Sequence, residues 1–273
     1  MTARLGVVAG AGPLPGRVVA AQTALGRPVF VLGLEGIADA AGFAGRPQAW
    51  VRLGQFGQAI DRLATAKVTE VVLAGLVPRP SLDSIGLDAR GLKMLASLAT
   101  GGLGADRLLA RIVAELESEG FRVVGIESVL EDVLAPLGPL GRCRPDQAAR
   151  NDIALGAKVA RELGRLDVGQ AVVVRQGVVV GVEAAEGTDA LLERCVGPTG
   201  NPRGVLVKVA KPGQERRVDL PAIGPATVDR VLAAGLAGIA VEAGAALVLD
   251  RALCVARADA AGVFIVGIAA DAA

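Results

Sequence analysis

The sequence predicts an α/β protein built from two domains, and its periodicity, its Gly and Pro breaks and its length all support this. The first half repeats a short apolar run, a Gly or Pro break and a helical stretch, which is typical of a parallel sheet with crossover helices. A Pro- and Gly-rich stretch then interrupts the pattern, and 273 residues are enough for about two cores. We therefore expect a Rossmann-like parallel-sheet domain over residues 1–135, a linker over 136–147 and a mixed α/β domain over 148–273.

The first domain is expected to alternate strands and helices, which places its ligand at the carboxyl ends of the strands. Its apolar runs predict strands over Leu5–Ala9, Pro28–Leu32, Trp50–Leu53, Val68–Ala74 and Phe121–Ile126. The stretches between them predict helices over Pro15–Leu25, Phe56–Ala66, Leu92–Leu98 and Asp106–Glu119. The loops at residues 10–16, 54–56 and 75–80 follow strands and are the expected ligand contacts.

The second domain is expected to begin with an amphipathic helix and a hairpin. Apolar spacing predicts a helix over Ala148–Leu163, and the valine-rich run Ala171–Glu183 predicts two strands joined at Gln176-Gly177. Downstream, the pattern predicts helices over Thr227–Ala234 and Arg251–Ala260, and strands over Gly238–Glu242, Ala246–Leu249 and Val263–Ile268. The most apolar window, 231–249, carries Glu242, so it indicates buried elements and not a membrane span.

Composition excludes several classes of function. There is no histidine, which removes Ser-His-Asp and Cys-His catalysis and His-ligated zinc. The near-balance of 29 basic and 28 acidic residues, with few aromatic rings, argues against a nucleic-acid surface. Cys143, Cys195 and Cys254 form no CxxC pair, which favours buried thiols in a reducing cytoplasm, and the first residues lack the pattern of an export signal. Chemistry is then left to carboxylates, Lys, Arg, hydroxyls, backbone amides and a metal.

The first candidate site is the loop AGAGPLPG after the first strand. Gly10 and Gly12 precede a helix that begins at a proline, so backbone N–H groups and the helix dipole can meet a phosphate. Together with Gly16, and with Glu35 at the end of the second strand, the loop is similar to a dinucleotide fingerprint. Tight-turn packing explains the same glycines equally well. In the later loop LVPRP, Arg79 is either an anion clamp or a solvated side chain.

The second candidate site is the stretch KVAKPGQERRVDLPAIGP, which combines cations, an amide and a carboxylate between apolar runs. If residues 215–220 are extended, Val218 and Leu220 face the core, and Asp219 ends the strand with its carboxylate facing a cleft. An ordinary exposed charge at a strand end is the alternative interpretation.

The segment GVEAAEGTDALLERC adds carboxylates to this second region. Thr188 is placed to cap a helix with Asp189 in its first turn, and capping alone is a sufficient explanation for both. Glu186 precedes them, and Lys208 and Lys211 follow before Asp219. Carboxylates and lysines without His or Cys are typical of phosphoryl transfer assisted by a hard cation.

A further set of motifs runs along the chain: LGVVAGAGPLP, DARGLKML, RLDVGQAVVV, VEAAEGTDALL, KPGQERRVDLPAIGPATV and AGLAGIAVEAGAALVLDR. In order and spacing they resemble the LpxI family of UDP-2,3-diacylglucosamine pyrophosphatases over nearly the whole chain. The family usually has a GGG run and DLPTIG, where this sequence has Ala11 and Ala222, so details of loop contact differ.

The resemblance implies a cytoplasmic hydrolase of lipid A biosynthesis that depends on a divalent cation, usually Mg²⁺. It implies that UDP-2,3-diacylglucosamine is held between the two domains and split into UMP and lipid X (2,3-diacylglucosamine 1-phosphate) by water attack at the β-phosphorus. The family's important aspartate matches Asp219, which we expect to hold the metal with Glu186 or Asp189. The expected catalytic residues are Asp219, Asp189, Thr188, Lys211 and Gln214. The expected substrate contacts are Gly10, Gly12, Leu14, Gly75, Arg79, Lys93 and Lys208.

The expected partner is a lipid-linked nucleotide sugar, with transient contact with the inner-membrane surface and with a homodimer as a further expectation. Two other functions remain open at this stage. The glycine-rich loop with Glu35 suits a nicotinamide-dependent oxidoreductase, and the same domains suit a noncatalytic carrier of a nucleotide sugar or lipid.

Overall fold

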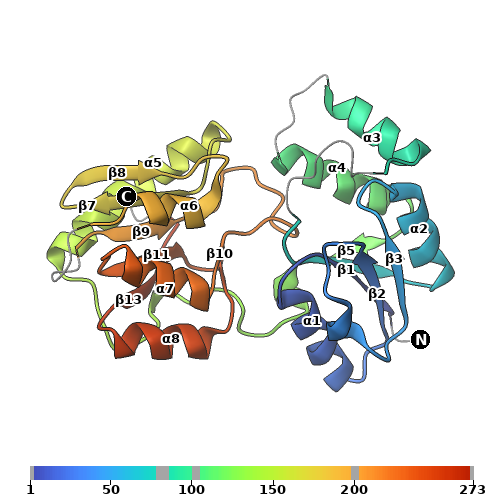
Figure 1. The fold of residues 1–273 in the computed structure, drawn as a ribbon, viewed down its shortest axis with the longest axis horizontal. Helices are drawn as coiled ribbons and strands as arrows, with labels where there is room; N and C mark the ends of the chain where they lie inside the picture. Colours follow the sequence, from blue (N-terminus) through green and yellow to red (C-terminus); the bar gives the residue numbers. More distant parts are fainter. Residues whose placement is uncertain (1–2, 78–85, 100–104, 198–202, 271–273) are drawn as a thin grey trace. The chain divides into compact units, whose positions relative to one another are not determined.

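The computed structural model describes residues 3–77, 86–99, 105–197 and 203–270. The chain divides into two units: residues 1–131 with 215–219, and residues 132–214 with 220–273 (Figure 1). The division falls after Glu131, before the predicted linker. Strand β6 (Gly138–Pro139) lies inside that predicted linker and pairs with β13 (Phe264–Ile268), so the segment is part of the second sheet.

The first unit is a parallel sheet with helices, as predicted. Its strand order is β3-β2-β1-β4-β5, and all neighbouring strands are parallel. The strands are β1 (Leu5–Ala9), β2 (Val29–Leu34), β3 (Gln48–Val51), β4 (Glu70–Ala74) and β5 (Arg122–Val123). The helices are α1 (Leu14–Ala24), α2 (Phe56–Thr65), α3 (Ala89–Ala99) and α4 (Ala105–Ser118), with short 3-10 turns η1 (Ala40–Phe43) and η3 (Ile126–Ser128).

This topology places the loops that follow β1 and β4 at the same edge of the first sheet. The strand order reverses between β1 and β4, and ligands of open parallel sheets bind beyond the carboxyl ends of the strands at such a point. The core beneath joins α2 and α4 to the sheet through side chains such as Leu63, Val71 and Leu116. We refer to this set as the first-unit core; its buried members are Phe30, Leu32, Leu34, Val51, Ile60, Leu63, Val68, Val71, Val113, Leu116, Phe121 and Val123.

The second unit is a mixed sheet covered by helices on both faces. Its strand order is β6-β13-β11-β9-β7-β8; β9, β11 and β13 are parallel, and β7 runs antiparallel to both of its neighbours. Besides β6 and β13, its strands are β7 (Ala171–Arg175), β8 (Val178–Val182), β9 (Val205–Lys208) and β11 (Gly238–Glu242). A separate parallel pair is formed by β10 (Ala222–Ile223) and β12 (Leu247–Val248). The helices are α5 (Gln147–Arg165), α6 (Gly187–Arg194), α7 (Pro225–Ala233) and α8 (Arg251–Ala260). The fold-class prediction is confirmed.

The predicted hairpin at Gln176-Gly177 is confirmed. Gln176 has φ of 52° and Gly177 has φ of 75°, the two positive values that a type I′ turn requires. Asp152 of α5 is 3% exposed, and its carboxylate accepts from both turn amides, at 3.0 and 2.7 Å. Helix α5 therefore stabilises the hairpin turn through the carboxylate of Asp152.

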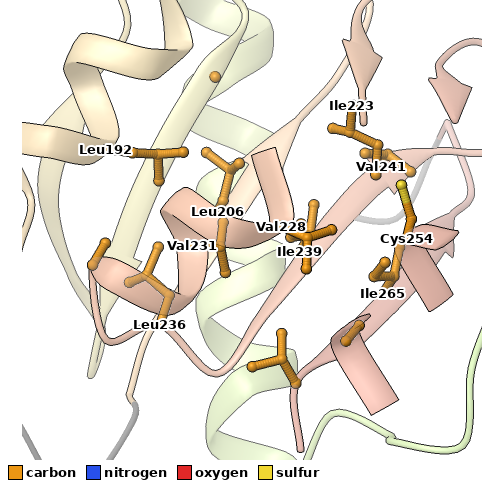
Figure 2. Close-up of a cluster of buried hydrophobic side chains, with 14 of the residues drawn as sticks. Leu192, Leu206, Ile223, Val228, Val231, Leu236, Ile239, Val241, Cys254 and Ile265 are labelled. Carbon is orange, nitrogen blue, oxygen red and sulfur yellow. The ribbon is translucent and has the colours of Figure 1, made fainter. Parts of the chain in front are cut away.

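The larger core of the second unit lies between its sheet and helices α6, α7 and α8. Leu192, Val231 and Cys254 of these helices meet Leu206 and Ile239 of the strands (Figure 2). Helix α5 covers the opposite face. The interpretation of the cysteines as buried thiols is confirmed for Cys195 and Cys254: burial raises the pKa of Cys195 and raises that of Cys254 to about 11.

Candidate functional site

The glycine-rich loop after β1 is fastened to the loop after β4. Ala11 and Leu76 form an antiparallel bridge with N–H···O distances of 2.7 and 2.9 Å. A Cβ on Gly10 would lie 2.6 Å from the carbonyl oxygen of Leu76, and one on Gly75 would lie 2.6 Å from that of Ala11. Gly10 and Gly75 are thus glycines because two backbones touch there, which favours the tight-packing interpretation for this pair.

The amides that follow Ala11 point to a different role. In the described part of the chain, the N–H groups of Gly12, Leu14 and Gly16 donate to no protein acceptor. Gly12 is exposed, has φ of +90° and has nothing within 4 Å of a Cβ position. Because Leu14 and Gly16 lie in the first turn of α1, their N–H groups have no acceptor within the helix and share the positive end of its dipole. These donors suit a phosphate or a carbonyl oxygen.

The other predicted contacts of the first unit are dispersed. Arg79 lies outside the described residues, and Lys93 is an exposed side chain of α3. Glu35 follows β2 and pairs with Arg52 at 3.5 Å. Asp88, which sequence reasoning missed, accepts at 2.7 and 3.2 Å from amides in the first turn of α2 and at 2.7 Å from a first-turn amide of α3. It joins the starts of two helices.

The second unit brings together Thr188 and Lys208 around a carboxylate that sequence reasoning missed. Thr188 Oγ1 donates to Glu183 Oε1 at 2.5 Å, and Lys208 Nζ donates to Thr188 Oγ1 at 2.8 Å. Glu183 and Lys208 are each 7% exposed. The amide of Gln170 donates to the second Glu183 oxygen at 3.0 Å, and Lys208 also donates to the carbonyl oxygen of Ala222 at 3.2 Å. We call Glu183, Thr188 and Lys208 the buried polar triad.

The triad fixes the direction of the Thr188 hydroxyl. An ammonium group only donates and a carboxylate only accepts, so the hydroxyl gives its proton to Glu183 and one lone pair to Lys208. One acceptor position is left on Thr188 Oγ1. The hydroxyl therefore suits a water of a metal's hydration shell, which donates, better than a phosphate oxygen, which accepts.

Replacing Thr188 by valine is expected to destabilise the protein by about 2 kcal/mol, because Glu183 and Lys208 then lose a partner below the surface. Thr188→Ser keeps the hydroxyl and serves as the matched control. Denaturant unfolding of both variants gives the comparison; equal midpoints for the valine and serine variants would show that the triad contributes nothing to stability.

The predicted residues at the start of α6 are paired with arginines. Asp189 pairs with Arg230 at 3.1 Å, and Glu186 accepts from Arg194 at 2.9 Å, which lowers the pKa of Glu186. The prediction that Thr188 caps the helix is wrong. Glu186 takes the N-cap position without a side-chain cap, because Thr188 already lies within the first turn and its hydroxyl serves the triad.

Lys211 and Gln214 are joined by a hydrogen bond in the loop before the RVDLP motif. The amide of Lys211 donates to Gln214 Oε1 at 3.2 Å, and Lys211 Nζ pairs with Asp167 at 2.8 Å. Gln214 is 8% exposed, and its Nε2 has no hydrogen-bond partner among the described residues. A buried donor without an acceptor is costly, so an oxygen of a bound ligand would be stabilised there.

The turn that carries Asp219 belongs to the first unit. The predicted strand over residues 215–220 is wrong, because the amides of Val218 and Asp219 both donate to the carbonyl oxygen of Glu215, at 3.1 and 3.0 Å, and close a helical turn. Asp219 is partly exposed, and its carboxylate has no hydrogen bond or ion pair within the described residues. Asp219 thus stands on one unit and the buried polar triad on the other.

The described residues contain no group of three or more His, Cys, Asp or Glu side chains that could hold a metal. Mg²⁺ is commonly bound by one or two carboxylates together with substrate phosphates and waters, and needs no all-protein cage. The unpaired carboxylate of Asp219 fits that mode, whereas Glu186 already binds Arg194.

The chain matches two domain families and one full-length relative. Residues 4–133 match the LpxI N-terminal domain and residues 136–266 the LpxI C-terminal domain. The UDP-2,3-diacylglucosamine pyrophosphatase LpxI of Caulobacter vibrioides is 43% identical over 273 residues, covering 97% of each chain.

Two of the solved structures that match this chain have low TM-scores. The UDP-glucose 4-epimerase of Thermus thermophilus has a TM-score of 0.31 and 18% identity, covering 53% of this chain and 41% of that one. The biotin carboxylase domain of the Hydrogenobacter thermophilus 2-oxoglutarate carboxylase has a TM-score of 0.29 and 13% identity, covering 65% and 36%. Such scores carry no argument about function. Because both domain families match in order and a full-length relative shares 43% identity, the chain belongs to the LpxI family.

Proposed function

We propose that this protein hydrolyses the pyrophosphate bond of UDP-2,3-diacylglucosamine and releases UMP and lipid X. The observation that carries the proposal is the 43% identity to a relative named UDP-2,3-diacylglucosamine pyrophosphatase, which extends over 97% of both chains. The motifs EGTDA and KPGQERRVDLP lie within the matched C-terminal domain.

In this proposal, residues of both units bind the substrate. The amides of Gly12, Leu14 and Gly16, which have no acceptor among the described residues, support a nucleotide or phosphate contact on the first unit. On the second unit, the buried polar triad and Gln214 Nε2, which has no partner in the described ranges, support contacts with polar groups of the substrate. Asp219 belongs to the first unit, so the catalytic groups also come from both.

We propose that Asp219 and Thr188 have different roles in cleavage of the phosphoanhydride. Mg²⁺, when bound, would supply neutralising charge at the phosphate oxygens and would lower the pKa of the attacking water. Asp219 is the residue that would hold this ion, because its carboxylate is partly exposed and unpaired in the described chain. Thr188 would accept a hydrogen bond from a water through its remaining lone pair and so orient it toward the β-phosphorus.

The experiment that tests the proposal is incubation of the purified protein with UDP-2,3-diacylglucosamine and Mg²⁺, with both products measured by mass spectrometry. We expect UMP and lipid X in equal amounts. Substrate binding without product would favour a noncatalytic carrier. Binding of NADH at micromolar concentration without binding of UDP would favour an oxidoreductase that uses the glycine-rich loop.

We further propose that the protein acts in the cytoplasm and touches the inner membrane while it takes up its two-chain lipid substrate. None of the helices in the described ranges is long and apolar enough to span a bilayer.

A further inference from the structure

The turn that ends at Asp219 is held by a helix nearly a hundred residues earlier in the chain. Arg217 donates to Glu117 of α4 at 2.5 Å and to the carbonyl oxygen of Val123 at 3.5 Å. All three residues belong to the first unit. The sequence around the turn matches the LpxI C-terminal domain, so a short segment of that domain is incorporated into the other unit.

The same guanidinium also closes the turn from within. Arg217 donates to both oxygens of Glu215, at 2.9 and 2.8 Å. Hydrogen bonds from Arg217 lower the pKa of Glu215, and those to Glu215 and then Glu117 raise the pKa of Arg217. Arg217 is therefore a charged link between the turn and α4.

Val218 fixes the rotation of the turn. Its side chain packs against the first-unit core, although it is only partly buried. Arg217 is thus directed to α4 and Val218 to the core, and these contacts fix the backbone direction from which the Asp219 side chain leaves the turn. The carboxylate of Asp219 is the group in this turn that is left unpaired within the described residues.

We propose that Glu117 is a positioning residue: by holding Arg217, it sets the direction in which the Asp219 carboxylate meets the substrate. This inference rests on the proposed function, because it assigns the reaction to Asp219. The Glu117–Arg217 pair is partly exposed, with side chains 40% and 37% accessible, and such a pair contributes little to stability. Its loss is therefore expected to appear in turnover and not in unfolding.

The test compares Glu117→Gln with Glu115→Gln in the full-length protein. Glu115 lies on the same helix and pairs with Arg111 at 3.4 Å, so its variant controls for removal of one α4 charge. For Glu117→Gln we expect kcat to fall about tenfold, since small misplacement of a catalytic group is costly, with KM changed less than about twofold. The melting temperatures of both variants and the kcat of Glu115→Gln should match those of the wild type.

A double-mutant cycle shows whether Glu117 acts through Arg217. Arg217→Met should lower kcat at least as much as Glu117→Gln, and adding Glu117→Gln to it should cause no further loss. If the two losses in kcat multiply in the double variant, Glu117 does not act through Arg217. That result, or equal kcat values for Glu117→Gln and Glu115→Gln, would overturn the positioning role but not the proposed function. Absence of UMP release by the wild type would instead overturn the proposed function together with this inference.

Discussion

Replacing Asp219 by alanine is expected to lower kcat by at least about a hundredfold while substrate affinity changes only a few fold. The reason is that a metal-holding or water-orienting carboxylate acts mainly on the charge that develops in the transition state, and removal of one such group costs that much in other enzymes. Single-turnover release of UMP and equilibrium binding of the substrate separate the two effects.

A matched control for this variant is Asp229→Ala. Asp229 is an exposed carboxylate of α7 that pairs with Arg257, outside the residues assigned to the site. Its kcat should equal that of the wild type. An Asp219→Ala enzyme with wild-type turnover would reject the assigned role of Asp219.

Chelation is expected to abolish turnover, and added Mg²⁺ to restore it. The described residues offer no cluster of three His, Cys, Asp or Glu ligands, so waters and substrate phosphates would complete the coordination of the ion. We therefore also expect calorimetry to show weak Mg²⁺ binding to the free protein and tighter binding with substrate present. Full activity in excess EDTA would contradict the metal dependence.

The parts of the fold that local rules govern were predictable from the sequence. Alternating apolar runs and helical stretches gave the parallel sheet, and the Gln176-Gly177 pair gave the hairpin, because a turn with two positive φ values favours such residues. Residues 215–220 were misassigned because their alternation is short. Arg217 binds Glu117, a hundred positions earlier, and Val218 packs against the first-unit core, so tertiary contacts help to hold the turn.

The candidate site was predictable in its residue types but not in its pairing. Glu183 was missed because a carboxylate at a strand end resembles a solvated charge; only its burial and its bond to Thr188, five residues on, mark it. The roles of the individual glycines were not predictable either. Gly10 and Gly75 allow close backbone contact, while the amide of Gly12 has no acceptor within the described chain, and no sequence pattern separates these roles.

The most direct measurement is a crystal structure of Asp219→Ala grown with UDP-2,3-diacylglucosamine. The expected result is a single substrate molecule bound by both units, with its diphosphate beside position 219 and within hydrogen-bonding reach of groups next to the buried polar triad. A substrate bound by one unit alone, with position 219 facing bulk solvent, would contradict it.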